Sequence, residues 1–373
     1  MFTGTEEKRL MNSDRKKFRA VIAGSGSYLP ELHVPNSDFL PNEFFDDEGT
    51  AIPKEENATV IRKLKEITGI EERRYVLPAQ VNSDIALIAA QRAIASSQID
   101  IESLDLIIVA HNFGNVRSDN PRIDLVPSLA SRVKNDLRIR NASCVAFDLI
   151  FGCAGWLEGI IQSIGRIEAG EIRHALIIGS ETLSRVSDPH DRDSMIYADG
   201  AGAMVIQRAE ENSESGFLSC VTKSVALDLA YSLSMGLSNN PDFPDNRLFL
   251  KMNGRLLYEF ALKLVPDVIT QAIEQAGIPV EKIDKLLIHQ ANTKMDEAIL
   301  KRVFRHFGKK EIPAGIMPMT IDYLGNTSVA TLPTLYDLIA NQKFAGQEFH
   351  EENHLVFASV GAGVNMNAVV YKV

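Results

Sequence analysis

An internal duplication constrains the fold of this chain more than any other feature of its sequence. Residues 93–109 read AIASSQIDIESLDLIIV, and residues 272–288 read AIEQAGIPVEKIDKLLI, with identical residues at several positions and aliphatic exchanges at most others. A second pair of segments, HALIIGSE (174–181) and HLVFASVG (354–361), has nearly the same spacing. Two matches in the same order indicate two related α/β halves of about 180 residues each.

The apolar runs of both halves are continuous rather than alternating, which is typical of strands covered by helices on both faces. We expect strands within 19–30, 104–112, 143–149, 174–181, 201–208, 285–291, 354–360 and 367–373, and helices over about 81–97, 154–169, 256–276, 293–307 and 329–342. Two halves that share a central layer of helices predict a helix–sheet–helix–sheet–helix arrangement, an α/β fold.

This pattern divides the chain into a charged N-terminal tail (1–18), a first half (19–212) and a second half (213–373). The segment 35–57 has no hydrophobic periodicity, so we expect it to be an excursion on the surface.

Composition excludes several classes of protein. With 45% hydrophobic and 24% charged residues, the chain can bury a large core and is not disordered. No apolar run approaches the roughly 18–20 residues of a membrane span, and the charged N-terminus does not have the apolar segment of a secretory signal. A net charge of −10 argues against non-specific nucleic-acid binding. Three cysteines are too few for a disulfide framework, so we expect a cytoplasmic protein.

Cys153 is the first candidate for chemistry. It follows an apolar strand and precedes a helix with apolar spacing, in the sequence FGCAGWLEG. The free N–H groups and the dipole at the start of that helix are expected to stabilise a thiolate and lower the pKa of the thiol. The alternative is a buried core thiol, which is the reading we favour for Cys144 and Cys220.

His289 and Asn326 follow strands or turns of the second half. His289 ends an apolar strand, at the edge where open α/β sheets place their chemistry, and the duplication has Ala110 at the equivalent position. Asn326 stands in a glycine-containing turn before a helix, where it could equally serve as an N-cap. The glycine-rich stretch GAGVNMN (361–367) could present a backbone N–H to the same point, whereas DGAGA (199–203) has no need of a catalytic role.

The ordered set of motifs resembles β-ketoacyl-acyl-carrier-protein synthase III, a branch of the thiolase superfamily, over nearly the whole chain. The matching segments are GSGSYLPELHVPN (24–36), TGIEERR (68–74), CAG (153–155), GSETLSR (179–185), DGAGA (199–203), HQAN (289–292) and GNTS (325–328). The resemblance implies the duplicated, five-layered αβαβα thiolase-like fold, a homodimer, and a Cys–His–Asn site at Cys153, His289 and Asn326. It implies no metal and no cofactor beyond the phosphopantetheine of thioester substrates.

The implied reaction is a Claisen condensation. Cys153 would take an acyl group from a thioester, and His289 and Asn326 would hold the carbonyl of a malonyl- or β-ketoacyl-carrier substrate as its enolate forms. The N–H groups of Cys153 and of the loop with Gly361 and Gly363 would form the oxyanion hole. Acyl carrier protein is therefore the implied partner.

Some positions depart from the family pattern. Lys63 and Ile67 stand where relatives that accept coenzyme A carry the Trp and Arg that clamp adenine, and Val126 stands where a bulky Phe usually closes the acyl pocket at the dimer interface. A basic stretch after His289 is a candidate docking site for the carrier, or else a solvated helix face; its candidate residues are Lys294, Lys301, Arg302 and Arg305.

Several functions stay open at this stage. One is a specialised ketosynthase that joins two long acyl units, of the dialkylresorcinol or aryl-polyene type. A cysteine-dependent thioester hydrolase or acyltransferase, or a catalytically silent subunit, could use the same fold. A dinucleotide-binding oxidoreductase is disfavoured because Leu29 stands where its glycine fingerprint after the first strand needs a third glycine.

Overall fold

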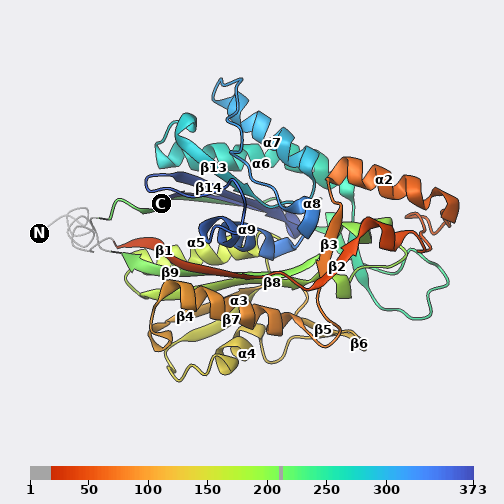
Figure 1. Ribbon diagram of the computed structural model, residues 1–373, viewed down its shortest axis with the longest axis horizontal. Helices are drawn as coiled ribbons and strands as arrows, with labels where there is room; N and C mark the ends of the chain where they lie inside the picture. The colour runs from red at the N-terminus through yellow and green to blue at the C-terminus, as the bar shows by residue number, and fades with distance from the viewer. Residues whose placement is uncertain (1–17, 210–212) are drawn as a thin grey trace, which may run out of the picture.

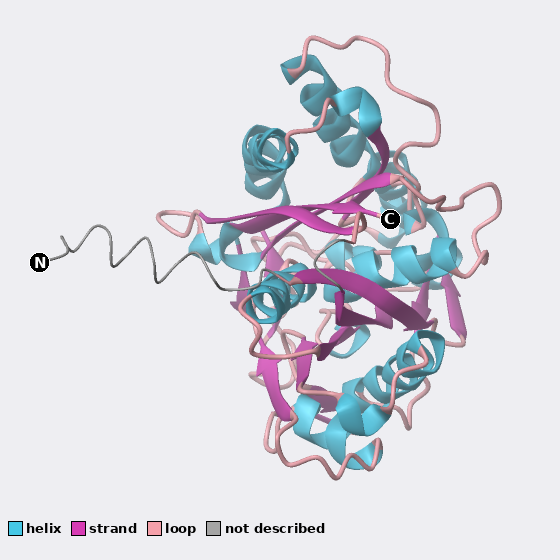
Figure 2. Cartoon of the chain, turned by 90° about the vertical axis from the view of Figure 1, so that its left-hand side faces the viewer, coloured by secondary structure: helices cyan, strands magenta, loops and turns pink. Residues whose placement is uncertain are grey.

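Five layers, alternately helical and β-sheet, make up the described part of the chain in this computed structural model, as expected from the sequence (Figure 1). The described residues are 18–209 and 213–373, so the tail 1–18 lies outside them except for Phe18. Figure 2, turned by 90°, shows the two main sheets one above the other with helices between them.

Each main sheet draws its strands from one half of the chain. The first has the order β1 (Arg19–Tyr28), β9 (Asp199–Ala209), β8 (His174–Thr182), β4 (Leu106–Ala110) and β7 (Val145–Leu149). The second has the order β10 (Gly216–Ser224), β15 (Asn365–Lys372), β14 (His354–Gly361) and β13 (Ile283–Ile288). Parallel pairs join β4 to β7 and β8, and β13 to β14, so these strands end at the same edge of their sheets.

Helices cover both sheets and fill the space between them. The outer layers are α3 (Asn82–Ser97) and α4 (Leu129–Asp136) on the first sheet, and α6 (Gly254–Ala276) and α7 (Thr293–His306) on the second. The central layer is α5 (Gly155–Glu168) and α9 (Thr331–Ala340), one from each half. The expected helices are thus confirmed to within about two residues at their ends, the usual uncertainty of helix boundaries.

Asp105 and Asp284, which occupy the same position in the two repeated segments, make equivalent hydrogen bonds in both halves. Asp105 Oδ2 accepts hydrogen bonds from the backbone N–H of Arg173 (2.6 Å) and His174 (3.2 Å), where β8 begins. Asp284 Oδ2 accepts one from the N–H of His354 (2.8 Å), where β14 begins. Both acids therefore fix the start of the strand that pairs next to their own, which explains why the two repeated segments occur together.

The largest core lies around the central helices and belongs to both halves. Trp156 of α5 donates to the carbonyl of Ile177 in β8 (3.2 Å), and its ring lies 6.2 Å from that of Phe357 in β14. Tyr336 of α9 packs on the same Phe357 with ring centres 5.9 Å apart. One continuous apolar cluster thus joins the two sheets.

The segment 35–57 runs mostly exposed over the surface, as expected, but two of its side chains anchor it. Phe39 and Phe44 are buried in an apolar cluster together with Ile196 and with Leu250, which belongs to a separate two-stranded sheet of residues 233–236 and 249–252, called the cap below. The helix α2 (Asn57–Thr68), which the sequence did not reveal, follows directly.

Short elements missed by the sequence build that cap and its surroundings. They are the strand pairs β2 (Leu32–Pro35) with β3 (Glu72–Tyr75), β5 (Asn115–Arg117) with β6 (Asn120–Asp124), and β11 (Leu233–Gly236) with β12 (Phe249–Met252), and the short helix α8 (Ile321–Leu324). Elements of three to five residues carry too little periodicity to be recognised. Among the described residues, no helix is both long and apolar enough to span a membrane.

Close packing of α3 on β1 gives a test of the fold. A Cβ at Gly26 would lie 2.7 Å from the carbonyl oxygen of Ala89 and would collide with the backbone of Ala93, so Gly26→Ala is expected to destabilise the protein by roughly 1–3 kcal/mol. Gly165→Ala is the control: that glycine lies inside α5 with nothing within 4 Å, and alanine there should stabilise by about 0.5–1 kcal/mol. Urea unfolding measures both, and a neutral Gly26→Ala would contradict the packing.

Candidate active site

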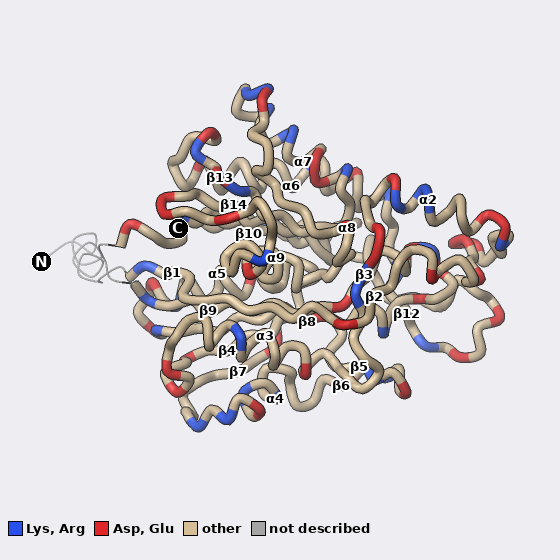
Figure 3. Tube along the Cα trace, in the orientation of Figure 1, with Lys and Arg blue, Asp and Glu red and all other residues tan. Residues whose placement is uncertain are grey.

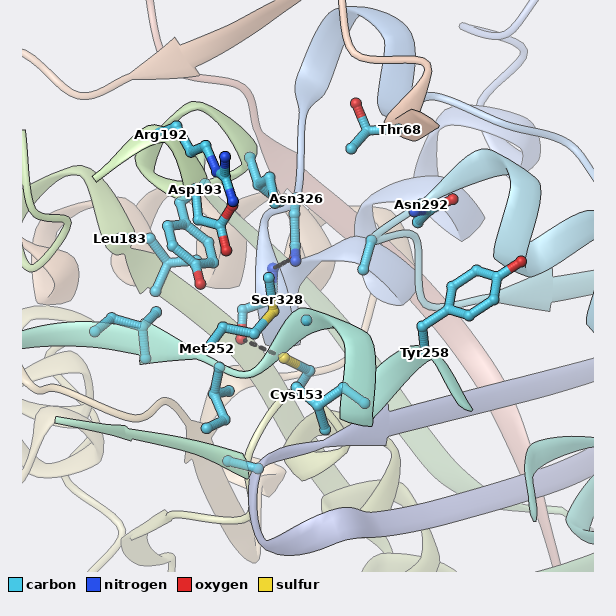
Figure 4. A pocket seen from close by; sticks show the side chains of 18 of the residues that line it. Thr68, Cys153, Leu183, Arg192, Asp193, Met252, Tyr258, Asn292, Asn326 and Ser328 are labelled. Atoms are coloured by element: carbon cyan, nitrogen blue, oxygen red, sulfur yellow. Dashed lines mark hydrogen bonds between the residues drawn. The ribbon is translucent and has the colours of Figure 1, made fainter. Parts of the chain in front are cut away.

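A cavity of about 930 Å³ collects the three residues that the sequence singled out (Figure 4). Cys153 comes from the turn before α5, His289 from the end of β13, and Asn326 from the turn after α8, and all three line it. The remaining wall includes apolar side chains, among them Leu183 after β8 and Leu250 and Met252 of β12.

The turn that carries Cys153 is held by the second half of the chain. Ser359 Oγ of β14 donates to the carbonyl of Cys153 (3.0 Å), and Asn367 Nδ2 of β15 donates to the carbonyl of Ala154 (3.1 Å). Gly361 passes so close that a Cβ there would collide with Cys153 N, and Gly152 faces Ala362 in the same way. The backbone around the sulfur is therefore fixed by contact between halves.

Cys153 is half-buried on the cavity wall, with its sulfur beside the start of α5. Its one hydrogen-bond partner among the described residues is Ser328 Oγ, which donates at 3.3 Å. Burial raises the pKa of the thiol to about 11, and the Ser328 hydroxyl opposes this shift. The lowered pKa expected from the helix start is thus wrong for the protein without substrate, because desolvation of the thiolate outweighs its local donors.

His289 is buried and neutral at pH 7. Its backbone N–H donates to Ala358 O (2.9 Å), which ties the end of β13 to β14. Burial lowers the pKa of the imidazole to about 4, opposed by a hydrogen bond with the backbone of Ser328. Asn292, three residues later, caps α7 by accepting from Met295 N (3.1 Å), so the strand-to-helix turn has the form that the sequence predicted.

Asn326 is oriented by its own turn. Its backbone pairs with Ile196 and Ala198 on both sides, and its Oδ1 accepts from the N–H of Ser328 at 2.8 Å. With the amide oxygen engaged in this way, the Nδ2 donor is left for the cavity. The N-cap-like contact and a role toward a ligand are therefore compatible in one side chain.

The loop expected to complete an oxyanion hole reaches the cavity at one end. Gly361 and Ala362 line the wall next to Cys153, whereas Gly363, with φ +75°, is not part of the lining. The backbone neighbour of the sulfur is accordingly the Gly361–Ala362 turn, and Gly363 serves the turn itself.

The positions that depart from the family pattern lie in different places. Lys63 and Ile67, exposed on α2, do line the cavity at its rim. The side chain of Val126 is 86% exposed and lies outside this chain's cavity, to which the same connection contributes Phe113 instead. A role for Val126 in the pocket of a partner subunit therefore stays a prediction.

The four candidate docking residues are exposed along α7 but do not form a purely basic face (Figure 3). Lys301 lies 3.8 Å from Glu297, and Arg302 Nη1 donates to the carbonyl of Leu262 (2.6 Å). Lys294 lies beside the lining residue Met295, and Arg305 follows one turn after Lys301.

Two residues near the sulfur of Cys153 were not predicted from the sequence: Ser328, which contacts the sulfur, and Asn112, which contacts Ser328. Ser328 stands in the GNTS motif, and its contact with the sulfur was not anticipated. Asn112 follows β4 and hydrogen-bonds both Ser328 and the buried Glu181.

Asp199 accepts from Ser184 and Val76, so the expected structural role of its motif is confirmed. Among the described residues, no cluster of His, Cys, Asp and Glu could hold a metal.

Two parts of the sequence match models of one protein family. Residues 147–225 match 3-oxoacyl-[acyl-carrier-protein (ACP)] synthase III, and residues 273–373 match the C-terminal part of the same enzymes. The β-ketoacyl-[acyl carrier protein] synthase III of Thermus thermophilus is similar in structure, with 28% identity and a TM-score of 0.75 over 94% of this chain and 98% of that one.

Two further solved structures are similar. The 3-oxoacyl-[acyl-carrier-protein] synthase III of Aquifex aeolicus has 25% identity and a TM-score of 0.75 over 95% of this chain and 100% of that one. The priming β-ketosynthase of the R1128 polyketide pathway has a TM-score of 0.77 over 96% of this chain and 97% of that one. Its identity of 22% indicates a shared fold.

Proposed function

The chain belongs to the 3-oxoacyl-[acyl-carrier-protein] synthase III family of condensing acyltransferases, and we propose that it forms a carbon–carbon bond on an acyl group carried by Cys153. The observation that carries the proposal is the meeting of Cys153, His289 and Asn326 on one cavity wall, with the sulfur at the start of α5.

The first half-reaction transfers the acyl group. Cys153 Sγ attacks the thioester carbonyl of the donor, a new C–S bond forms, and the carrier thiol leaves with the proton that the cysteine gives up. The oxyanion of the tetrahedral intermediate would accept hydrogen bonds from the N–H of Cys153 and of the Gly361–Ala362 turn. Since burial raises the pKa of the resting thiol, we expect its proton to be lost as the substrate binds.

The second half-reaction uses the two donors of the second half. Asn326 has its Nδ2 free for the thioester carbonyl of the extender, and the one N–H of neutral His289, which hydrogen-bonds the backbone of Ser328, would be shared with that carbonyl. That carbonyl becomes an enolate when a malonyl unit loses CO₂, or when a β-ketoacyl unit gives its α-proton to the unprotonated ring nitrogen of neutral His289. The enolate carbon attacks the acyl–Cys153 carbonyl, and the sulfur leaves. Each donor is worth roughly 3–4 kcal/mol of transition-state stabilisation.

We propose an acyl carrier protein as the donor of the acyl group. Lys63 and Ile67 offer neither the aromatic ring nor the guanidinium that would hold the adenine of coenzyme A. A carrier protein needs only its pantetheine arm in the cavity and a contact on the surface. The exposed lysine and arginine side chains of α7 could supply that contact. The names of the relatives above give an acyl-carrier-protein thioester as the product, which supports a carrier protein as the bearer of the extender; the choice of donor rests on Lys63 and Ile67.

The size of the cavity favours a second candidate, a specialised ketosynthase that joins two long acyl units. At about 930 Å³ the cavity stands at the upper end of the roughly 300–1,000 Å³ of small-molecule sites. A pantetheine arm together with a long acyl chain fits that size better than an acetyl group does. Chain-length profiles of self-acylation would decide between the two.

We also propose a homodimer formed through β7. This strand is the edge of the first sheet, and Val145 and Phe147 on it and Ile150 beyond its end are 50%, 37% and 60% exposed. An exposed edge with apolar side chains is a template for pairing with a second copy. Asp148 of β7 accepts from the N–H groups of Leu129 and Ala130, so the stretch with Val126 lies beside this edge.

The division of labour among the three residues can be tested by mass spectrometry of acyl adducts. Cys153→Ala should abolish self-acylation from an acyl-carrier thioester. His289→Ala and Asn326→Ala should still acylate at Cys153, while condensation falls by about 10²–10³ for each donor removed. Acylation at Cys144 or Cys220 in the Cys153→Ala variant would refute the assignment, and rapid release of free acid from the wild type would indicate a hydrolase.

Donor choice is a kinetic comparison of one acyl chain on two carriers. The acyl-carrier thioester should outperform the matching acyl-CoA, and Lys294→Glu with Arg305→Glu should raise the KM for the carrier with little change in kcat, more strongly at low salt. Arg140→Glu, in the turn between α4 and β7 on the opposite side of the molecule, is the matched control (Figure 1). Equal rates with acyl-CoA, unaffected by the reversals, would refute this docking surface.

The dimer is testable in solution. Phe147→Glu should turn the dimer into a monomer in light scattering, because a charge on the edge strand opposes pairing with its own copy. Leu227→Glu, a change of another exposed apolar residue (83% exposed), should leave the dimer intact. A dimer that survives Phe147→Glu would show that another surface is used.

A further inference from the structure

A chain of hydrogen bonds runs from the sulfur of Cys153 to a buried carboxylate that the proposed reaction does not use. Ser328 Oγ lies 3.3 Å from Cys153 Sγ, a contact drawn in Figure 4, and 3.3 Å from Asn112 Nδ2. Asn112 in turn donates to Glu181 Oε2 twice, from Nδ2 at 2.7 Å and from its backbone N at 2.9 Å. The chain therefore links β4, β8 and the turn that follows α8.

The direction of each hydrogen bond follows from the groups involved. A side-chain amide nitrogen only donates, so Asn112 Nδ2 gives one hydrogen to Glu181 and the other to Ser328 Oγ. The serine hydroxyl has a single hydrogen, and a hydroxyl that accepts from Asn112 is free to give that hydrogen to Cys153 Sγ. A donor aimed at sulfur favours the thiolate over the thiol.

We propose that Asn112 is a positioning residue for the nucleophile. Its two hydrogen bonds to Glu181 fix the Asn112 side chain, which in turn orients the Ser328 hydroxyl so that this hydroxyl donates to Cys153 Sγ. The inference rests on the proposed function of Cys153 and adds the means by which its thiolate becomes accessible in a buried site.

The residues around this series of hydrogen bonds are held firmly enough for Asn112 to position the Ser328 hydroxyl. Glu181 is fully buried at the end of β8, which pairs with β4 directly before Asn112. Ser328 has φ +54°, a strained conformation for a residue with a side chain, and its N–H is bound by Asn326 Oδ1. The backbone of Ser328 is thus fixed, and the direction of its hydroxyl depends on the hydrogen bonds with Asn112 and Cys153.

The charged groups around these hydrogen bonds raise the pKa of Cys153, so they oppose the effect of the Ser328 hydroxyl. Burial raises the pKa of Glu181 to about 7, against the effects of His111 and Asn112 and together with that of Asp199. The charge of Glu181 itself raises the pKa of Cys153, and Tyr197 is a further titratable group among the described residues that interacts with this thiol. A direct electrostatic benefit from Glu181 is thus absent, which leaves orientation of Asn112 as its contribution.

The experiment is a double-mutant cycle read by alkylation. The rate at which iodoacetamide modifies Cys153 is followed against pH by mass spectrometry in the wild type, Ser328→Ala, Asn112→Leu and the double variant. Each single variant should raise the apparent pKa of Cys153 by about one unit, a roughly tenfold slower reaction at a fixed pH below it. The double variant should be no slower than Ser328→Ala, since both changes remove the same donor.

Additive shifts, or an unchanged apparent pKa in Asn112→Leu, would overturn the proposal. Asn115→Ala is the matched control: this buried asparagine of the same connection bonds Ser83 and should leave the apparent pKa unchanged. Should Asn112→Leu fail to fold, Asn112→Ala is measured instead with the same expectation. Alkylation needs no acyl substrate, so failure of this proposal is distinguishable from failure of the proposed condensation.

Discussion

The contact between two glycine-containing turns, Gly152–Cys153 and Gly361–Ala362, is the constraint on which the rest of the site depends. The first turn belongs to one half of the chain and the second to the other, and neither glycine leaves room for a side chain. Ser359 and Asn367 add hydrogen bonds from the second half to the carbonyls of the same turn. As a result, the position of the sulfur relative to His289 and Asn326 is set by backbone packing and not by flexible side chains.

The two titratable groups of the Cys153, His289 and Asn326 set carry little charge, although charged side chains such as Arg192 and Asp193 also line the cavity. The pKa of His289 is lowered to about 4 and that of Cys153 raised to about 11, both by burial, so imidazole and thiol are neutral near pH 7. Such a wall suits a neutral thioester, and it reserves the hydrogen-bond donors for the oxyanion and enolate that form during reaction. Glu181 is buried behind the wall and does not line the cavity.

Long patterns in the sequence predict the main strands and helices. Features that depend on contact between segments far apart in the chain are not visible in any local pattern. The continuous apolar runs and the repeat predicted the strands of the two main sheets except β10, and the helices α3, α5, α6, α7 and α9 but not α2 or α4. By contrast, the burial of Phe39 and Phe44 depends on a cap contributed by residues some 200 positions away, and no local pattern in 35–57 reports it. The pKa of Cys153 was misjudged for the same kind of reason: the helix start is visible in the sequence, whereas the extent of desolvation is not. Asn112 was overlooked because its partners, Ser328 and Glu181, lie far from it in the chain.

The shared central layer has a consequence for how the molecule folds. α5 from the first half and α9 from the second are covered on both sides, and Trp156 and Tyr336 meet on Phe357 in the second sheet. Neither half, if separated, could shield the inner face of its sheet from water. The duplication has thus produced a single cooperative unit in which two ancestral modules are no longer autonomous, and partial unfolding of one would release the other's core as well.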